Sequence, residues 1–334
     1  MVQPAKSPEL ITPSVQFSRR QFLAATATVA ATGLSTSACV AQTPSTAEDA
    51  VKRFYGTLTD VQKKEVCFDW DHKDPSRGLL RKYISANWQV TKPAIKSDFF
   101  TADQQRAIRE IFEGVIHRDW HDRIDKQQQD DAGGFGRNQS IAIFGDPAAG
   151  KFQCAITGRH LTVRCDGGSE KKVAFAGPIV YGHAAAGFVE KPDHPGNVFW
   201  HQAKEANELY QVLDGKQQQK ALVEKAPAES RIAFRDRSER PGIPISELTA
   251  DQKERAQEVL RKLLDPYRQS DRDGVVACLK SQGGLDGCNL AFFQEGDLGD
   301  DGVWDIWRIE GPSFVWHFRG SPHVHVWVSV AEQA

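Results

Sequence analysis

The chain has 334 residues, and its 42 Lys and Arg residues nearly balance its 44 Asp and Glu residues, which gives a formal net charge of −2. This balance argues against a dedicated nucleic-acid-binding protein, because such proteins carry a basic excess. Hydrophobic residues make up 40% of the chain and charged residues 26%, a composition typical of a folded globular protein and not of a disordered one.

The first 44 residues have the features of an export signal followed by a flexible leader. The stretch Ser18–Leu23 reads SRRQFL, and a mild apolar run rich in Ala and Thr follows it. Paired arginines ahead of Phe-Leu and a weak apolar segment predict a Tat signal, read by the Tat translocation machinery. An alternative is a lipoprotein cut before Cys39. We therefore expect an exported protein, periplasmic or cell-surface, with one folded domain over residues 45–334 and no transmembrane span.

The cysteine spacing predicts a disulfide in the oxidising compartment that this signal implies. Cys278 and Cys288 enclose the glycine-rich turn LKSQGGLDG, and we expect them to pair. Cys154 and Cys165 lie in neighbouring strand-like segments and are candidates for a second bridge. The sequence has no C-x-x-C motif, which argues against a thiol-redox motif or a zinc ribbon.

Four segments share a helix-start pattern, in which an apolar residue precedes Thr or Asp and a Gln follows within a few residues. The Thr or Asp side chain caps the first free N–H groups of a helix, and the apolar residue packs back onto it. The pattern occurs at Leu58–Lys64, Phe100–Ile108, Leu213–Leu222 and Leu248–Leu260. We therefore expect the helical part of the chain to include roughly Ser45–Lys64, Ala102–Trp120, Trp200–Glu224 and Thr249–Tyr267. The unequal spacing of the four starts argues against a solenoid of regular repeats.

Strand-like segments rich in β-branched and aromatic residues are bounded by Gly, Pro and Asp. They cover residues 140–145, 152–165, 172–182, 289–296, 303–311, 313–320 and 323–330. Short turns join the last three, which predicts a C-terminal β-meander. The predicted fold class is therefore α+β, with several helices flanking a mostly antiparallel sheet.

Two stretches, Lys126–Arg137 and Lys225–Pro244, have the composition of surface loops or linkers. The segment Gly145–Lys151 contains two Gly residues and a Lys, but it lacks the Gly-Lys-Ser/Thr step of a phosphate-binding loop. We therefore expect no nucleotide cofactor. The sequence also lacks the G-x-S-x-G motif, which argues against a serine hydrolase of the α/β-hydrolase type.

The clearest chemical signal is an H-x-H pair, His323 and His325, in the last strand-like segment. Side chains alternate along a strand, so both imidazoles and Trp327 share one face while the intervening valines point into the core. The two Cα atoms lie about 6–7 Å apart, which lets both rings reach one ion. His160, in the segment TGRHLTV, is the preferred third ligand, and His317 is the alternative. Zinc or copper suits such nitrogen ligands; the competing interpretation is a solvent-facing polar pair.

The motifs FGDP, GRHLTV, FAGP, WRIEGPSFVWHFRG and HVHVW follow one another in this order along residues 51–330. With them the chain resembles the bacterial domain-of-unknown-function 3500 family, whose members carry an export signal, L-[ST]-x-x-Q helix starts and a C-terminal H-x-H followed closely by Trp. The resemblance implies that His160 and the pair His323 and His325 recur as a set. Two positions depart from the family pattern. Arg159 replaces the first His of the family's G-H-H-L, and Trp327 follows His325 after two residues instead of three.

Two functional hypotheses from different classes follow. In the first, the exported protein binds zinc or copper through the three histidines, and the supporting or substrate-side residues are Arg159, Glu310 and Trp327. In the second, the same side chains line a non-catalytic pocket for an unknown small-molecule ligand or a cell-surface component, without metal. The motifs specify no reaction, so they leave open whether a metal centre here is catalytic.

Overall fold

The computed structural model of the protein describes residues 46–184, 197–229, 232–299 and 302–333. All of them belong to one unit of the chain, Gln42–Ala334. The predicted Tat signal and Cys39 lie outside the described residues.

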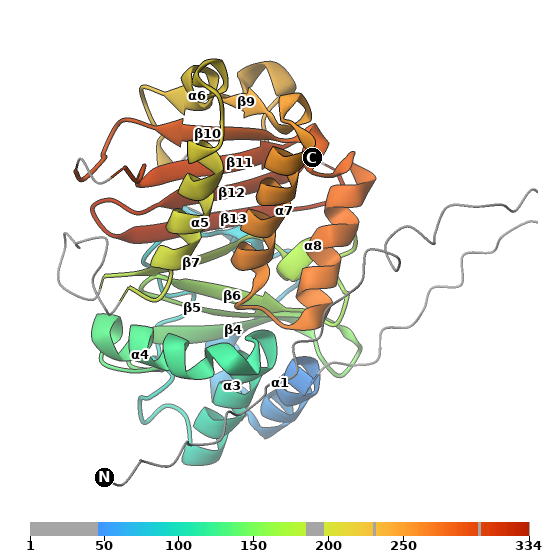
Figure 1. Cartoon of the computed structure of the whole chain (residues 1–334). Coiled ribbons are helices and arrows are strands. Elements are labelled where there is room, and N and C mark those ends of the chain that lie inside the picture. Colours follow the sequence, from blue (N-terminus) through green and yellow to red (C-terminus); the bar gives the residue numbers. More distant parts are fainter. Residues whose placement is uncertain (1–45, 185–196, 230–231, 300–301, 334) are drawn as a thin grey trace, which may run out of the picture. The chain divides into compact units, whose positions relative to one another are not determined.

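Among the described residues, eleven strands form one sheet in the order β1-β4-β5-β6-β7-β13-β12-β11-β10-β8, and β9 pairs with β10 (Figure 1). β2 (Lys73–Asp74) and β3 (Gly78–Leu79) form a separate two-stranded sheet. The strands of the large sheet are β1 (Cys67–Phe68), β4 (Gln139–Asp146), β5 (Lys151–Gly158), β6 (Leu161–Cys165), β7 (Ile179–His183), β8 (Leu222–Val223), β9 (Ile243–Pro244), β10 (Asn289–Phe293), β11 (Ile306–Gly311), β12 (Phe314–Arg319) and β13 (Val324–Val330).

Helices cover one face of this sheet, and the main hydrophobic core lies between the helices and the strands. Figure 1 shows α5 and α7 in front of the strands β10–β13. Alternate strand residues such as Ile156, Tyr181 and Val326 belong to this core. The helices are α1 (Thr46–Thr57), α2 (Asp60–Val66), α3 (Ala102–Val115), α4 (His121–Ala132), α5 (Trp200–Gln211), α6 (Gly215–Ala221), α7 (Ala250–Leu264) and α8 (Gln269–Ser281).

The large sheet consists of two halves with the same plan. In each half, a two-residue strand follows a short helix and pairs in parallel with the first of four consecutive strands, β1 with β4 and β8 with β10. The four strands of each half are antiparallel to one another. The halves meet where β7 pairs antiparallel with β13, with Tyr181 opposite Val326. This palindromic strand order indicates two copies of one unit related by an approximate two-fold axis.

The four predicted helix starts are confirmed, and they link the helices of each half in the same way. Each is a capping box, in which the Thr or Asp side chain accepts the N–H of a Gln and that Gln accepts the N–H of the cap. The side-chain amides of Gln62 and Gln104 also bond to each other, at 2.9 and 3.0 Å. Gln217 and Gln252 do the same in the second half, at 3.0 and 2.8 Å. The recurring Gln is therefore both a helix cap and a link between two helices.

The prediction of a mostly antiparallel sheet is wrong. The sheet is mixed, with a parallel pair toward each end, β1 with β4 and β8 with β10. β1 and β8 are two residues long and directly follow the capped helices α2 and α6. Strands this short cannot show the alternation of apolar and polar residues by which strands are recognised in a sequence.

The predicted strand 172–182 is a strand only from Ile179, because a 3-10 turn occupies Ala174–Ala176. Two further segments, which bear on the candidate site, also fold differently from their sequence-based assignment. The stretch 126–137 is not a surface loop throughout, because α4 runs to Ala132 and ends at Gly133, which has a φ of 73°. The segment 152–165 is not one strand but the hairpin of β5 and β6, which turns at Arg159 and His160. The first correction brings an acidic helix end toward the sheet, and the second places His160 in a turn.

All five described cysteines are free, so the predicted disulfide between Cys278 and Cys288 is wrong. Cys278 is buried in the second half of α8, and the thiol of Cys288 lies 3.9 Å from the carbonyl oxygen of Gly284 in the turn after that helix. Burial raises the pKa of the Cys288 thiol to about 12, which keeps it in the unreactive protonated form. Cys154 and Cys165 lie opposite each other on β5 and β6 and are also free.

Irregular chain packs on the face of the sheet opposite the main core. Around residues 80–95, the indole N–H of Trp88 donates to the hydroxyl of Thr162 on β6 at 2.9 Å. In residues 232–243, Arg235 donates to Glu310 on β11 at 2.6 Å. This second face therefore carries buried polar side chains, and the candidate site lies on it, where the two halves of the sheet meet.

Replacing Gln104 by Ala should destabilise the protein by about 2 kcal/mol, because it removes one half of a capping box and leaves buried amide and carbonyl partners unpaired. The measurement is chemical denaturation at neutral pH. Gln129→Ala is the matched control, since Gln129 is exposed on α4 and its loss should change the free energy of unfolding by less than about 0.5 kcal/mol. Equal effects of the two variants would contradict a structural role for the paired glutamines.

Candidate metal centre

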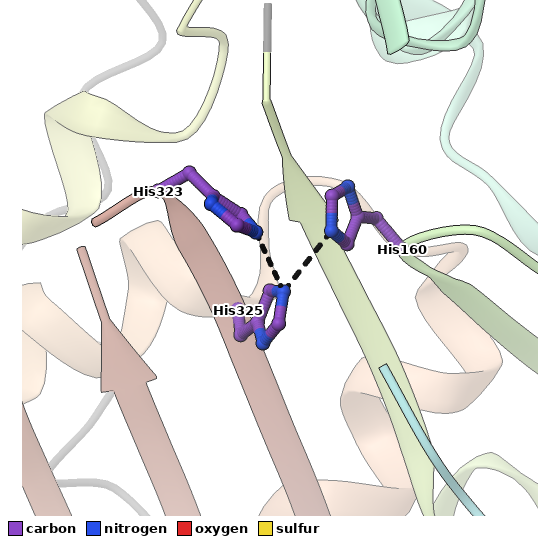
Figure 2. A group of neighbouring side chains, drawn as sticks. All are labelled: His160, His323 and His325. Carbon is purple, nitrogen blue, oxygen red and sulfur yellow. Dashed lines mark hydrogen bonds between the residues drawn. The ribbon is translucent and has the colours of Figure 1, made fainter. Parts of the chain in front are cut away.

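His160 occupies the turn of the β5–β6 hairpin. Gly158 and Leu161 are the last paired residues, so Arg159 and His160 alone make the turn. His160 has a φ of 51°, a conformation that is uncommon for residues with a side chain. Its backbone N–H donates to the carbonyl oxygen of Ala86 at 2.7 Å. The turn directs the imidazole toward the beginning of β13, as Figure 2 shows.

His323 immediately precedes β13, and His325 is the second residue of that strand. The valines at alternate positions of β13 point into the main core, so His325 points to the opposite, polar face, as the alternation predicts. On this face His325 lies opposite Gly182 of β7. The three histidines are buried, with exposed fractions of 3% for His160, 5% for His323 and 9% for His325.

The three imidazoles converge on their Nε2 atoms (Figure 2). The Nε2 atom of His325 lies 3.0 Å from the Nε2 atom of His323 and 3.0 Å from that of His160. One ring nitrogen from each residue lies within 4.8 Å of the others. Neighbouring ligand nitrogens of a tetrahedral zinc ion are about 3.3 Å apart, given Zn–N bonds of about 2.0–2.1 Å. The cluster therefore fits one metal ion after small shifts of the rings.

Asp131 contacts the ring nitrogen of His160 that faces away from the cluster. Its Oδ2 atom lies 2.5 Å from the Nδ1 atom of His160, and its side chain is 0% exposed. The Nε atom of Arg159 donates to the other carboxylate oxygen at 2.9 Å. Burial by itself would raise the pKa of Asp131, but the hydrogen bonds and charges of His160 and Arg159 hold it below its usual value. Asp131 is therefore an ionised acceptor on the side of His160 that faces away from the cluster.

Glu229 holds His325 in the same way. Its two carboxylate oxygens lie 3.1 and 3.3 Å from the Nδ1 atom of His325. Arg319 lies on the other side, with its Nε atom 3.2 Å from Glu229. Burial opposes ionisation of Glu229, but His325 and Arg319 lower its pKa below the usual value. Two of the three candidate ligands thus carry a carboxylate on the nitrogen that faces away from the cluster.

These carboxylates decide which ring nitrogens carry protons. An ionised carboxylate only accepts hydrogen bonds, so a neutral His160 and a neutral His325 each carry their proton on Nδ1. Their Nε2 atoms then present unshared electron pairs to each other across 3.0 Å. Burial lowers the pKa of His325 to about 4, although Glu229 opposes this shift, so a second proton on this ring is disfavoured at neutral pH. A ring whose Nε2 atom faces the cluster while a carboxylate contacts its Nδ1 atom has the orientation found in carboxylate–histidine–metal triads.

Gly182 leaves the space in which the cluster forms. It lies opposite His325, and a Cβ atom at this position would clash with the carbonyl oxygen of Val324 and come 3.4 Å from the Cβ atom of His160. The glycine therefore allows β7 and β13 to pair closely beneath the His160 side chain.

Two of the predicted supporting residues lie next to the cluster, in different roles. Arg159 contacts Asp131 and so acts on His160 through a second residue. Trp327 is buried on the same face as His325 and packs against Val180 and Ala86 in a small apolar cluster.

The other two polar residues singled out in the sequence lie farther along the sheet. Glu310, on β11, forms ion pairs with Arg235 and Arg308. His317, the alternative third ligand, accepts a hydrogen bond from the Nε atom of Arg308 at 3.3 Å on its Nδ1. Neither belongs to the group of converging histidines.

Asp131 and Glu229 are not recognisable as site residues in the sequence, because both lie in stretches with the composition of surface loops. Asp131 has one local signal: it follows another acid, Asp130, in the last turn of α4, where a negative charge is unfavourable to the helix dipole. An acid retained at such a position points to a partner outside the helix. Glu229 has no comparable signal, since only the fold brings it to His325.

A family model described as "Protein of unknown function (DUF3500)" matches residues 41–329 of the chain. The chain belongs to the DUF3500 family. This confirms the resemblance seen in the sequence motifs. The matched region of this DUF3500 protein contains the three histidines and the two carboxylates of the candidate centre. No curated protein and no solved structure gives a significant match to it. In the described part of this DUF3500 protein, none of the helices has the length and apolarity needed to cross a membrane.

Replacing Gly182 by Ala should destabilise the protein by about 1–3 kcal/mol, because the added methyl group forces β7 and β13 apart. Gly56→Ala is the control, since nothing lies within 4 Å of a Cβ atom at this exposed position of α1; it should stabilise the helix by up to about 1 kcal/mol. Thermal unfolding measures both. An unchanged melting temperature for Gly182→Ala would contradict the tight β7–β13 contact.

Proposed function

We propose that this DUF3500 protein binds one metal ion through the Nε2 atoms of His160, His323 and His325. Zinc is the expected metal. The observation that carries the proposal is the convergence of three buried imidazoles on their Nε2 atoms, with those of His160 and His325 3.0 Å apart. Asp131 and Glu229 contact the Nδ1 atoms of His160 and His325 and so fix the orientations of these two rings. Carboxylate–histidine–metal triads of this kind orient ligands and increase their basicity.

Zinc and copper both suit imidazole nitrogens. If the metal is zinc, three protein ligands are the number typical of a catalytic site and not of a structural one. Structural zinc sites use four protein ligands, whereas catalytic sites use three and keep a position open. Among the described residues, the convergent group has three members. Zinc bound there would supply Lewis-acid chemistry. The residues of the chain would hold the ion, keep its ligands neutral and exclude bulk water, since all three histidines are at most 9% exposed.

We also propose that the protein is exported by the Tat system, on the basis of SRRQFL at Ser18–Leu23. Tat export carries folded proteins, so the metal would be inserted before the protein leaves the cytoplasm. The alternative function, a binding pocket for a small molecule without metal, predicts the same location but no bound ion.

Metal content tests the central proposal. The full chain, purified without a polyhistidine tag, should contain about one zinc ion per molecule by mass spectrometry. His160→Asn should lower this at least about tenfold, because Asn tolerates the positive φ of the turn but supplies no imidazole. His117→Asn, at a surface position with a side chain 36% exposed, should leave the content unchanged.

A tag-free protein without bound metal, which also takes up neither zinc nor copper after dialysis, would contradict the proposal and favour the metal-free binding pocket. If the protein instead contains one copper ion per chain and loses it in His160→Asn, the proposed site stands and its metal is copper.

Asp131→Asn should weaken zinc binding by about 10–100-fold, because an amide no longer holds the Nδ1 proton of His160 as firmly as a carboxylate. Competition with a chromogenic zinc chelator measures the affinity. Asp130→Asn is the matched control one residue away; its carboxylate pairs with Lys126 on the outside of α4, and its loss should leave the affinity unchanged. Equal affinities for the two variants would refute the role of Asp131.

Replacing Arg19 and Arg20 together by Lys should retain the protein in the cytoplasm with its leader attached, because the Tat receptor reads the arginine pair. Cell fractionation followed by immunoblotting measures the location. Unchanged export of the double variant would show that another route is used.

A further inference from the structure

A row of cationic and polar side chains continues from the candidate metal centre along the same face of the sheet. Arg319 lies opposite His325, His317 lies opposite Trp327, and Arg308 lies opposite His317. Cross-strand partners point to the same face, so this row runs from β13 across β12 to β11. Arg319 joins it to the metal centre, because Arg319 also contacts Glu229 and the carbonyl oxygen of His323.

The row contains buried N–H donors without acceptors. Arg308 is 1% exposed, and its Nη2 atom has no hydrogen-bond acceptor among the described residues. The indole N–H of Trp327 is buried and meets no acceptor at hydrogen-bond distance and angle among the described residues, although it lies near enough to Glu229 to help lower the pKa of that carboxyl. A buried donor left without an acceptor costs about 1–3 kcal/mol, and more when it belongs to a charged group.

His317 adds a further N–H group to the row. Its Nδ1 atom accepts the Nε–H of Arg308 at 3.3 Å, so the neutral ring carries its proton on Nε2. Burial, followed by the charges of Arg308 and Arg319, lowers the pKa of His317 well below its usual value. The row therefore presents N–H donors, so a ligand that binds there must carry hydrogen-bond acceptors.

The charged groups around the row nearly balance. Arg308 and Arg319 contact Glu310 and Glu229, and Arg235 interacts with both Glu310 and Glu239, so the N–H groups left without acceptors, and not a net charge, favour an anionic ligand. The outer side of the row is open to solvent, since the side chains of Arg235 and Arg319 are 24% and 19% exposed.

Arg164 shows what a purely structural arginine looks like on this face. It is also buried, on β6, and its three guanidinium nitrogens donate to the carbonyl oxygens of Pro178, Arg81 and Tyr83 at 2.7, 2.6 and 2.7 Å. Arg164 thus has an acceptor for each nitrogen, whereas Arg308 keeps one nitrogen free.

We propose that Arg308 and Arg319, with His317, bind an oxyanion group, a carboxylate or a phosphate, of the molecule on which the metal centre acts. The bound molecule is a substrate only if the proposed metal centre exists, so this inference rests on the proposed function. It assigns the substrate to the class of small anionic molecules. The anionic group lies over β11 and β12, and the rest of the molecule extends toward His325.

Titration calorimetry of the zinc-loaded full chain with inorganic phosphate, and separately with acetate, tests the proposal. At least one of the two anions should bind, and Arg308→Lys should weaken its binding about tenfold or more, because Lys keeps the charge but lacks the second guanidinium N–H. Arg164→Lys, the control on the same face, should bind as the wild type does. Arg319→Lys provides a second test in case Arg308→Lys does not fold, and it should show the same loss.

The anion and metal results separate the two proposals. A wild-type protein that contains zinc but binds neither anion overturns the inference and leaves the metal centre standing. Anion binding that is lost in His160→Asn but unchanged in Arg308→Lys and Arg319→Lys also overturns it, because the anion then binds the metal alone. Anion binding that persists in His160→Asn and weakens in Arg308→Lys supports the subsite even if the protein proves to hold no metal.

Discussion

The candidate centre depends on one interaction, the contact of two carboxylates with the outward-facing nitrogens of two buried imidazoles. Asp131 and Glu229 lie at hydrogen-bond distance from the Nδ1 atoms of His160 and His325, which turns the Nε2 atoms of both rings toward each other, 3.0 Å apart. Burial lowers the pKa of His325 to about 4, so its Nε2 atom is available as an electron-pair donor at neutral pH. The surrounding structure must therefore bring segments from four places in the chain to one point and keep water away from it.

The duplicated plan of the sheet brings these segments together. The two halves meet at β7 and β13, and the histidines come from both: His160 from the hairpin of the first half, His323 and His325 from the last strand of the second. The halves are not equivalent at this point. The hairpin that corresponds to Arg159–His160 is Pro312–Ser313, enclosed in the same way by a paired Gly and an apolar residue, and it supplies no imidazole. The seam between two similar units thus holds one asymmetric site.

The sequence predicted those parts of the structure that leave a local pattern. Capping boxes marked four helix starts, and strand alternation put His325 on the face opposite the core valines. His160 was selected as the third candidate ligand because of the family resemblance and because strand-like sequence surrounds it. The turn in which it lies was not recognisable, since its residues look like the middle of one strand. Asp131 and Glu229 were not predictable in this way, because a carboxylate that supports a ligand has no fixed spacing from it in the chain. The short parallel strands β1 and β8 were missed for a related reason: two residues carry no period, and their pairing is decided by the helices that precede them.

X-ray absorption spectroscopy of the tag-free, zinc-loaded full chain is the most direct test of the centre. The account predicts a first shell of three imidazole nitrogens at about 2.0–2.1 Å with one further light ligand, and outer-shell scattering typical of histidine rings. A shell with sulfur at about 2.3 Å, or one that lacks the imidazole pattern, would contradict it, because the five described cysteines would then be the source of ligands instead of the three histidines.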